Sequence, residues 1–309
     1  MSGLLLFPEY FYYINKTWTG GGNIINTVCN MDYHVHPGYS IDAEDISIIE
    51  YCREAVNRGL REVCFTPHLE VDPRRRHLDW FVRVNGKIEP MENECWLKYY
   101  FHDLEKARKE FSSSSLIVKA GLEVGFERGT ESVIEKIIKN YPFDFVLGSI
   151  HSLEHIAISS RKEYRAYYAR KDLSSLAKDY FGALKEAVDS GLFDCLGHLD
   201  LYKRFGYEFF GRRVNELHLG WVEEIFCLMA QMGIGLEVNT SGRRFCLNDF
   251  HPSEDILELA KKAGVQIFTV GSDAHKKTDL GCYTREAMAL LDKIGLRVSI
   301  FISRRPIFL

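Results

Sequence analysis

Histidine and carboxylate side chains recur at the ends of short, apolar stretches of this sequence. Six of the 11 histidines and three carboxylates share this placement: Asp32, His34, His36, His68, Glu123, His151, His198, Asp273 and His275. His34 and His36 are two residues apart, so on a strand their side chains point the same way. The same spacing links Asp273 to His275. Imidazole and carboxylate groups bind divalent metal ions, so these positions are candidates for a metal site.

Each of these residues alone is weak evidence. A single histidine at a strand end is more often a hydrogen-bonded polar residue, Glu123 would suit a salt bridge with Lys119, and Asp42 would suit a helix N-cap. Six imidazoles and several carboxylates on one face would, however, be poorly solvated or mutually repulsive without cations. Their number exceeds what one tetrahedral ion needs, so we expect two or three ions. Nitrogen and oxygen ligands without thiolate suit Zn²⁺, Mn²⁺ or Fe²⁺.

Clustered divalent ions would favour the hydrolysis of a phosphate ester. They lower the pKa of a bound water towards about 7 and neutralise anionic oxygens. Two arginines, Arg204 and Arg243, follow strand-like runs near the same positions and are candidates to bind the phosphate through paired hydrogen bonds. The alternative is that both are solvated loop residues.

Seven strand-like runs alternate with longer stretches of helical spacing. The runs cover residues 28–36, 62–68, 116–124, 143–151, 193–201, 234–240 and 266–275. This alternation predicts an α/β fold with a parallel sheet, and seven units favour a distorted (β/α)7 TIM-like barrel over two domains. The carboxyl ends of parallel strands meet on one face of a barrel, so the candidate ligands would gather there.

Three segments depart from this alternation. Residues 1–27 are aromatic-rich without a clear period, and we expect a flexible N-terminal extension before a single domain at 28–309. Residues 73–96 contain Asn85-Gly86, which predicts a hairpin turn, and residues 152–171 are polar with several tyrosines. Insertions after barrel strands lie over the active face, so either of the last two is a candidate lid.

The composition excludes several classes of protein. The chain has 309 residues, of which 46% are hydrophobic and 27% charged, so it is not a wholly disordered protein. It has no run of 18 apolar residues, which predicts no transmembrane helix. A net charge of −4 disfavours nucleic acid as a partner. Eight cysteines without a CxxC pair, and no secretory signal, predict a reducing, cytoplasmic location.

The motifs together resemble a known family. DYHVHPGYSID, TPH, GLEVGF, LGSIHS, LGHLDL, EVNTSGRR and GSDAH follow the order found in the PHP (polymerase and histidinol phosphatase) metallo-phosphoesterases. The resemblance runs from about residue 31 to about residue 292. GHLDLYKRFG and EVNTSG resemble the histidinol-phosphatase branch, which implies hydrolysis of L-histidinol phosphate to L-histidinol and phosphate in histidine biosynthesis.

The resemblance also implies a role for each ligand in a PHP-type barrel with three ions. The first ion would be held by His34, His36, Glu123 and Asp273, the second by Asp42, His68 and His275, and the third by Glu123, His151 and His198. Asp32 would not bind an ion itself but would orient a ligand, a lysine or an arginine. A metal-bound hydroxide would attack phosphorus, and His198, His275 and Asp273 would assist proton transfer to the leaving group.

Two other interpretations stay open at this point. The chain could be a PHP phosphoesterase for a nucleotide, a sugar phosphate or another ester, or a non-catalytic metal-binding PHP module. A degenerate module would lose ligands, whereas this sequence has every ligand position filled. We therefore expect a small-molecule phosphate ester as substrate and no membrane partner, with the oligomeric state undetermined.

Overall fold

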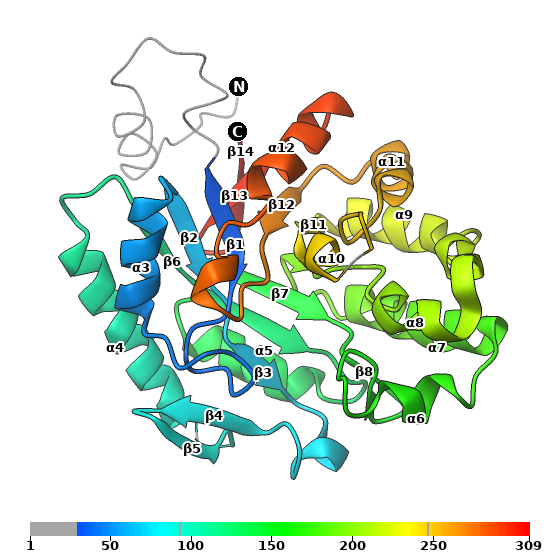
Figure 1. Cartoon of the computed structure of the whole chain (residues 1–309), viewed down its shortest axis with the longest axis horizontal. Coiled ribbons are helices and arrows are strands. Elements are labelled where there is room, and N and C mark those ends of the chain that lie inside the picture. The colour runs from blue at the N-terminus through cyan, green and yellow to red at the C-terminus, as the bar shows by residue number, and fades with distance from the viewer. Residues whose placement is uncertain (1–29, 93, 246) are drawn as a thin grey trace.

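A sheet of parallel strands forms the centre of the molecule, and helices surround it (Figure 1). The computed structural model describes residues 30–92, 94–245 and 247–309. The strands follow one another in the order β1-β2-β6-β7-β10-β11-β12, and β3 pairs with β6 beyond the end of β2. Their bounds are β1 Met31–Val35, β2 Glu62–Phe65, β3 His68–Glu70, β6 Ile117–Gly125, β7 Phe145–Ser149, β10 Cys195–Leu196, β11 Gly235–Asn239 and β12 Phe268–Gly271.

The first and last strands meet, which nearly closes the sheet into a barrel. Val35 and Ala274 form a parallel bridge. The His36 N–H donates to the Ala274 carbonyl at 2.9 Å, and the Ala274 N–H donates to the His34 carbonyl at 3.2 Å. Each of the seven predicted runs contains a strand of this barrel, so the predicted seven-stranded α/β barrel is confirmed.

Helices pack on the outside of the barrel through apolar faces. In Figure 1, α3 and α4 lie on one side of the sheet and α7, α9 and α11 on the other. The bounds of the longer helices are α3 Ile48–Asn57, α4 Cys95–Glu110, α5 Glu131–Asn140, α7 Leu173–Asp189, α9 Val222–Met232, α11 Glu254–Ala263 and α12 Thr284–Lys293. In α3 the buried residues are Ile48, Tyr51, Cys52 and Ala55, which recur at helical spacing.

The N-cap of α3, the helix after β1, is Ser47 and not Asp42. Ser47 caps α3, because its hydroxyl accepts from the Glu50 N–H while the Glu50 carboxylate accepts from the Ser47 N–H. Asp42 lies five residues earlier and does not cap this helix. The N-cap interpretation of Asp42 is therefore wrong, and its carboxylate is available to other groups.

The 73–96 insertion is a short helical turn followed by a hairpin. It comprises η1 (Pro73–Arg75), β4 (Phe81–Val84) and β5 (Lys87–Pro90). Asn85 and Gly86 have φ of 50° and 74°, the left-handed conformation that the predicted hairpin turn requires. β5 is exposed, whereas Val82 and Val84 of β4 are buried. One side of the hairpin is therefore part of the core, and its function as a lid stays a prediction.

The 152–171 insertion also packs against the barrel. It holds the small hairpin β8 (Ser152–Leu153) and β9 (Ile156–Ala157), followed by α6 (Tyr164–Tyr168). Tyr164, Tyr167 and Tyr168 are buried, and Tyr168 donates to the Tyr202 carbonyl at 3.0 Å. The tyrosines of this segment therefore anchor it to the next unit of the barrel.

The remaining described elements are short. They are α8 (Lys203–Phe210), η2 (Gly211–Glu216), α10 (Ser241–Arg244), η3 (Lys277–Asp279) and the C-terminal hairpin of β13 (Ser299–Ile302) and β14 (Arg305–Phe308). In the part of the chain that the structure describes, no helix has the length and apolar character needed to cross a membrane. The proposed extension at 1–27 lies outside the described residues, so the domain boundary stays a prediction.

Candidate metal centre and phosphate site

The structure brings all nine predicted ligands to the carboxyl ends of the strands. His34 lies in β1, His68 in β3 and Glu123 in β6, while the others follow β1, β7, β10 and β12: His36, Asp42, His151, His198, Asp273 and His275. Six segments that are far apart in the sequence therefore contribute to one cluster. A parallel barrel produces this convergence because all its strands end on the same face.

Glu123 is the centre of this cluster. Its side chain is only 1% exposed. Its Oε2 lies 3.0 Å from His68 Nδ1, 3.2 Å from His34 Nε2 and 3.3 Å from His36 Nε2. Its Oε1 lies 2.9 Å from His198 Nε2 and 3.1 Å from His151 Nε2. One carboxylate thus faces five imidazoles, an arrangement that suits a carboxylate shared between ions.

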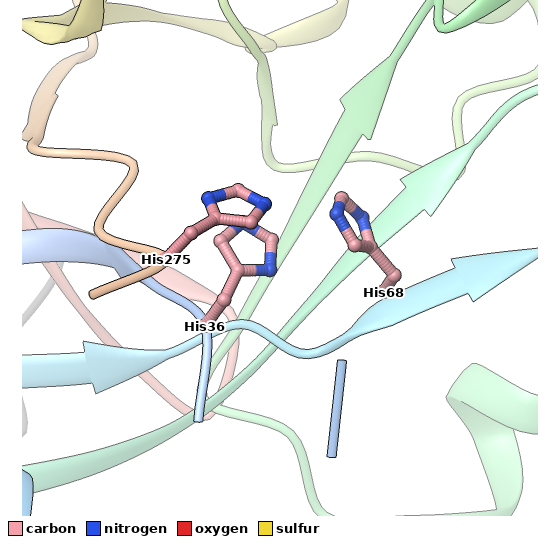
Figure 2. Close-up of side chains that lie close together, drawn as sticks. All are labelled: His36, His68 and His275. Atoms are coloured by element: carbon pink, nitrogen blue, oxygen red, sulfur yellow. The ribbon is translucent and has the colours of Figure 1, made fainter. Parts of the chain in front are cut away.

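Asp42, His68 and His275 form the more open side of the cluster. Asp42 Oδ2 lies 3.3 Å from His275 Nε2 and 3.5 Å from His68 Nε2. Figure 2 shows that the rings of His36, His68 and His275 lie close together, and the ring centroid of His36 is 4.0 Å from that of His275. The Asp42 side chain is 55% exposed, so solvent reaches the cluster here.

Glu123 Oε1 lies at hydrogen-bonding distance from His151 and His198, whereas several other distances in the cluster match those between the ligands of one metal ion. Ligand atoms of a tetrahedral zinc site, with bonds of about 2.0 Å, lie about 3.3 Å apart. Asp273 Oδ1 is 3.4 Å from His36 Nε2 and 3.3 Å from His275 Nδ1. Glu123 Oε2 and His68 Nδ1 are buried without a hydrogen-bond partner. Buried polar atoms are rarely left unsatisfied, so the cluster as a whole suits bound cations.

The protonation states in the cluster show the same need for positive charge. Burial alone would raise the pKa of Glu123, but the surrounding imidazoles of His34 and His151 hold it well below its usual range. Burial opposes protonation of His68 and His275, yet Asp42 raises their pKa values to about 9 and about 10. Without ions the carboxylates would hold protons on these rings, and bound metal would displace those protons.

Two glutamates orient the histidine rings, and the sequence analysis missed both. Glu237 Oε1 lies 2.6 Å from His34 Nδ1, and Glu70 Oε1 lies 2.8 Å from His151 Nδ1. Such a carboxylate fixes the ring so that the other nitrogen faces the metal. Glu70 lies two residues after His68 in β3, so the strand period was a signal that could have identified it.

Glycines make room for these pairs. A Cβ on Gly271 would lie 2.3 Å from His34 Cβ and 2.5 Å from Glu237 Oε1. A Cβ on Gly125 would lie 2.1 Å from Glu70 Oε2. Any larger residue at either position would displace the carboxylate that orients a histidine.

Asp32 contacts the backbone of β1 and of the segment after β12. Its carboxylate accepts from the backbone N–H groups of His34, Ser272 and Gly281 and from the Ser272 hydroxyl. In the described residues it contacts no histidine ring, lysine or arginine. Asp32 therefore holds the backbone of the candidate ligand His34 and joins β1 to the segment after β12, and the described residues give it no contact with a lysine or an arginine.

Two of the predicted ligands lie on strained backbone. His198 and Asp273 have φ of 38° and 57°, values that residues other than glycine rarely adopt. Each lies two residues after the end of a short strand, His198 after β10 and Asp273 after β12. Such conformations persist where the surroundings over-determine them, and they are common at functional sites.

Arg204 is an unpaired cation beside the cluster. Its guanidinium lies over the Phe245 ring at 3.5 Å from the centroid, and its Nε is buried without a hydrogen-bond partner. No carboxylate of the described residues forms an ion pair with it. Burial lowers the pKa of Arg204 to about 10, and the negative charge of Asp273 opposes this shift. A partly buried positive charge without an acidic partner among the described residues suits an anionic group bound beside the cluster.

Arg243, the second predicted arginine, and its neighbour Arg244 have different contacts. Arg243 is exposed, and its guanidinium lies over Phe250 at 4.6 Å. Arg244 instead donates to the Asp273 carbonyl at 3.0 Å, and its second terminal nitrogen is buried without a partner. The phosphate-binding role of Arg243 stays a prediction, whereas the turn of α10 directs Arg244 to the cluster. Lys203 is paired with Asp200 at 2.7 Å.

The family model of the PHP domain matches residues 32–241, which is more than half of the chain. The chain therefore belongs to the PHP domain family, as its motifs indicated. The match spans the strands from β1 to β11 and includes seven of the nine candidate ligands. The other two, Asp273 and His275, follow β12.

Proteins similar to this chain have related descriptions. A protein of Deinococcus radiodurans named "Probable histidinol-phosphatase" is 32% identical over 83% of this chain and 90% of its own length. The histidinol-phosphatase of Lactococcus lactis is 28% identical over 86% and 91%. A crystal structure of the histidinol phosphate phosphatase of Lactococcus lactis, in complex with zinc, L-histidinol and phosphate, has a TM-score of 0.70 and 25% identity, and covers 90% of this chain and 98% of that one.

Proposed function

We propose that this protein is a metal-dependent phosphomonoesterase that hydrolyses L-histidinol phosphate to L-histidinol and phosphate. The observation that carries the proposal is the cluster of imidazoles and carboxylates around Glu123, with the unpaired Arg204 beside it. The relative of known structure that holds zinc, L-histidinol and phosphate supports the substrate. The similar proteins from Deinococcus radiodurans and Lactococcus lactis support it as well.

The donor atoms support two to three divalent ions of the Zn²⁺, Mn²⁺ or Fe²⁺ class. We assign the ligands as the family resemblance implies: His34, His36, Glu123 and Asp273 for one ion, Asp42, His68 and His275 for another, and Glu123, His151 and His198 for a third. When bound, such ions supply a water of lowered pKa and neutralise negative charge on the phosphate. Glu237 and Glu70 keep His34 and His151 in the orientation that presents Nε2 to the cluster.

Arg204 and Arg244 bind the phosphate in this proposal. Phe245 covers one face of the Arg204 guanidinium, which limits its movement and keeps it from water. A planar guanidinium can donate two parallel hydrogen bonds to a phosphate. Because Arg244 also donates to the Asp273 carbonyl, it ties the bound phosphate to the segment that carries two ligands.

In this proposal, side chains near the open side of the cluster, which Asp42, His68 and His275 form, transfer a proton to the leaving alkoxide. His275 is 28% exposed, and its Nδ1 lies 3.3 Å from Asp273 Oδ1. His198 is buried, and its Nδ1 has no hydrogen-bond partner. His275 and Asp273 are less buried than His198, which favours them as the groups that protonate a departing alcohol, with His198 serving as a ligand.

A substrate panel tests the proposed function. Phosphate release is measured on the zinc- or manganese-loaded protein with L-histidinol phosphate, nucleotide and sugar phosphates, and a phosphodiester. We expect the highest kcat/KM for L-histidinol phosphate. A higher value for a nucleotide or sugar phosphate would overturn the substrate assignment. Absence of any hydrolysis by fully loaded protein would overturn the assignment as a phosphatase.

A further inference from the structure

Three chain segments that supply ligands continue into a second cluster of similar residues. The register of β3 and β6 pairs His68 with Glu123 and Glu70 with Gly125, and the next two residues bring Asp72 beside Glu127. The turn between β8 and β9 brings His155 to the same place. Each of the three lies four residues after a candidate ligand of the first cluster: Asp72 after His68, Glu127 after Glu123, and His155 after His151.

The two clusters are separate. Asp72 and Glu127 each lie two residues beyond the ends of β3 and β6, and four residues of extended chain span about 13 Å. His155 lies in the turn after β8, so the second cluster has donors of the same kind further along the same three chain segments. None of its three residues contacts Glu123 through the described hydrogen bonds or ion pairs.

The geometry of the second cluster suits a metal ion. His155 Nδ1 lies 2.7 Å from Asp72 Oδ2 and 4.0 Å from Glu127 Oε2, and all three donor atoms lie within 4.8 Å of one another. These two distances bracket the value of about 3.3 Å expected between ligands of a tetrahedral zinc ion. Small rotations of the Glu127 and His155 side chains would equalise them.

The charge of the second cluster is also unbalanced. The Asp72 side chain is only 6% exposed and lies beside a second carboxylate. Burial and the charge of Asp72 raise the pKa of Glu127, and His155 and the exposed Arg74 lower it without cancelling that effect. Two ionised carboxylates carry a charge of −2, which one divalent cation would balance.

His155 is held in an unusual backbone conformation. Glu154 and His155 form the turn of the β8–β9 hairpin with φ of 49° and 62°, where asparagine and glycine are preferred. Arg75 fixes the other side of the turn by donating to the His155 carbonyl at 2.8 Å. A residue kept in this region is usually held by its surroundings, and here the imidazole points at two carboxylates.

We propose that Asp72, Glu127 and His155 form a further divalent-cation site, distinct from the cluster around Glu123. Its one nitrogen and two oxygen donors suit a zinc-class ion, with the remaining coordination completed by water. The ion would fix the β8–β9 turn to the ends of β3 and β6. Because β8 begins directly after His151, this turn sets the path of the chain that leaves the first cluster.

The substitution His155→Asn gives a sharp test. Asparagine tolerates the left-handed backbone, so the turn keeps its conformation while the imidazole is lost. Glu154→Asn, at the adjacent turn position, is the matched control. Each protein is stripped with chelator, dialysed against excess Zn²⁺, passed through a desalting column and analysed for bound zinc. We expect His155→Asn to bind one zinc fewer per chain than the wild type, and Glu154→Asn to bind the wild-type number.

Thermal melting separates the site from a simple salt bridge between His155 and Asp72. If an ion binds there, zinc raises Tm more in the wild type than in His155→Asn. Equal zinc content in both proteins, with the same Tm difference in chelator and in zinc, would overturn the proposal. Asp72→Asn, which keeps an oxygen to accept from the Arg74 N–H, provides a second variant that should also lose one zinc. Because the readout is a difference in bound zinc, it is independent of whether the first cluster hydrolyses L-histidinol phosphate.

Discussion

At the residue scale, the account depends on how Glu123 is used. A buried glutamate usually needs one partner, but this one faces five imidazoles, and its Oε2 has no hydrogen-bond donor. A salt bridge would not require so many basic groups around one carboxylate. Cations placed between the carboxylate and the rings explain both the crowding and the missing hydrogen bond.

Replacing Glu123 with glutamine should therefore remove metal rather than unfold the protein. Glutamine keeps the shape but lacks the negative charge that ions need. We expect Glu123→Gln to lose at least one ion and its turnover to fall by more than about 100-fold, since loss of even an outer carboxylate costs about 10- to 100-fold. Elemental analysis, phosphate release and Tm on the same sample test this.

Glu62→Gln is the matched control for that variant. Glu62 is also a buried glutamate on a barrel strand, and burial raises its pKa to about 8, so it is largely protonated at pH 7. Its substitution should leave bound metal and turnover close to the wild-type values. Full metal content with normal turnover in Glu123→Gln would remove Glu123 from the site.

The arginines provide a second prediction at this scale. Arg204→Ala and Arg244→Ala should each lower kcat/KM by roughly 10- to 100-fold, because a charge-assisted hydrogen bond is worth roughly 1.5–3 kcal/mol. Bound metal should not change. Arg243→Ala is the control, since Arg243 is exposed and lies over Phe250, and we expect wild-type kinetics. A large loss confined to Arg243→Ala would reverse this assignment.

The sequence was more informative about ligands than about the residues around them. His34 and His36, or Asp273 and His275, could be predicted to share a face because strand geometry has a period of two. Glu237 could not be assigned to His34 in this way, since the two are 203 residues apart and meet only in the folded barrel. The choice between Arg243 and Arg244 depended on the turn of α10, which sequence spacing does not determine.

At the element scale, the β4–β5 hairpin supports the loop that carries Asp42. The Arg83 side chain of β4 donates to the carbonyls of Gly38, Ser40, Ala43 and Ile41, and its N–H donates to the Tyr39 carbonyl at 2.9 Å. The sequence predicted the hairpin from Asn85-Gly86 but could not show what it contacts. One side chain thus holds four backbone carbonyls of the loop that carries a candidate ligand.

Removing that side chain should loosen the ion that Asp42 is proposed to bind. We expect Arg83→Met to stay folded, because the apolar part of the side chain remains, but to lose affinity for one ion and to need more added metal for full activity. Arg76→Met is the control, as Arg76 lies in the same insertion and pairs with the exposed Glu92. Metal titration of activity tests this, and identical curves for all three proteins would contradict it.

At the scale of the whole molecule, the barrel explains how six distant segments form one site. The alternation of strand-like and helical stretches predicted the architecture, because a parallel sheet needs a crossover helix between strands. The closing contacts between β1 and β12 could not be predicted from any single motif, since Val35 and Ala274 are 239 residues apart. That closure places Asp273 and His275 beside His36 and so completes the cluster.

The measurement that tests the central claim most directly is phosphate release from L-histidinol phosphate as metal is removed and returned. Chelated, desalted protein is assayed, and Zn²⁺ or Mn²⁺ is then added in steps while bound metal is counted. We predict that activity falls to background without metal and recovers as the cluster around Glu123 fills with two to three ions. Chelated protein that contains less than one ion per chain and keeps full turnover would contradict the account.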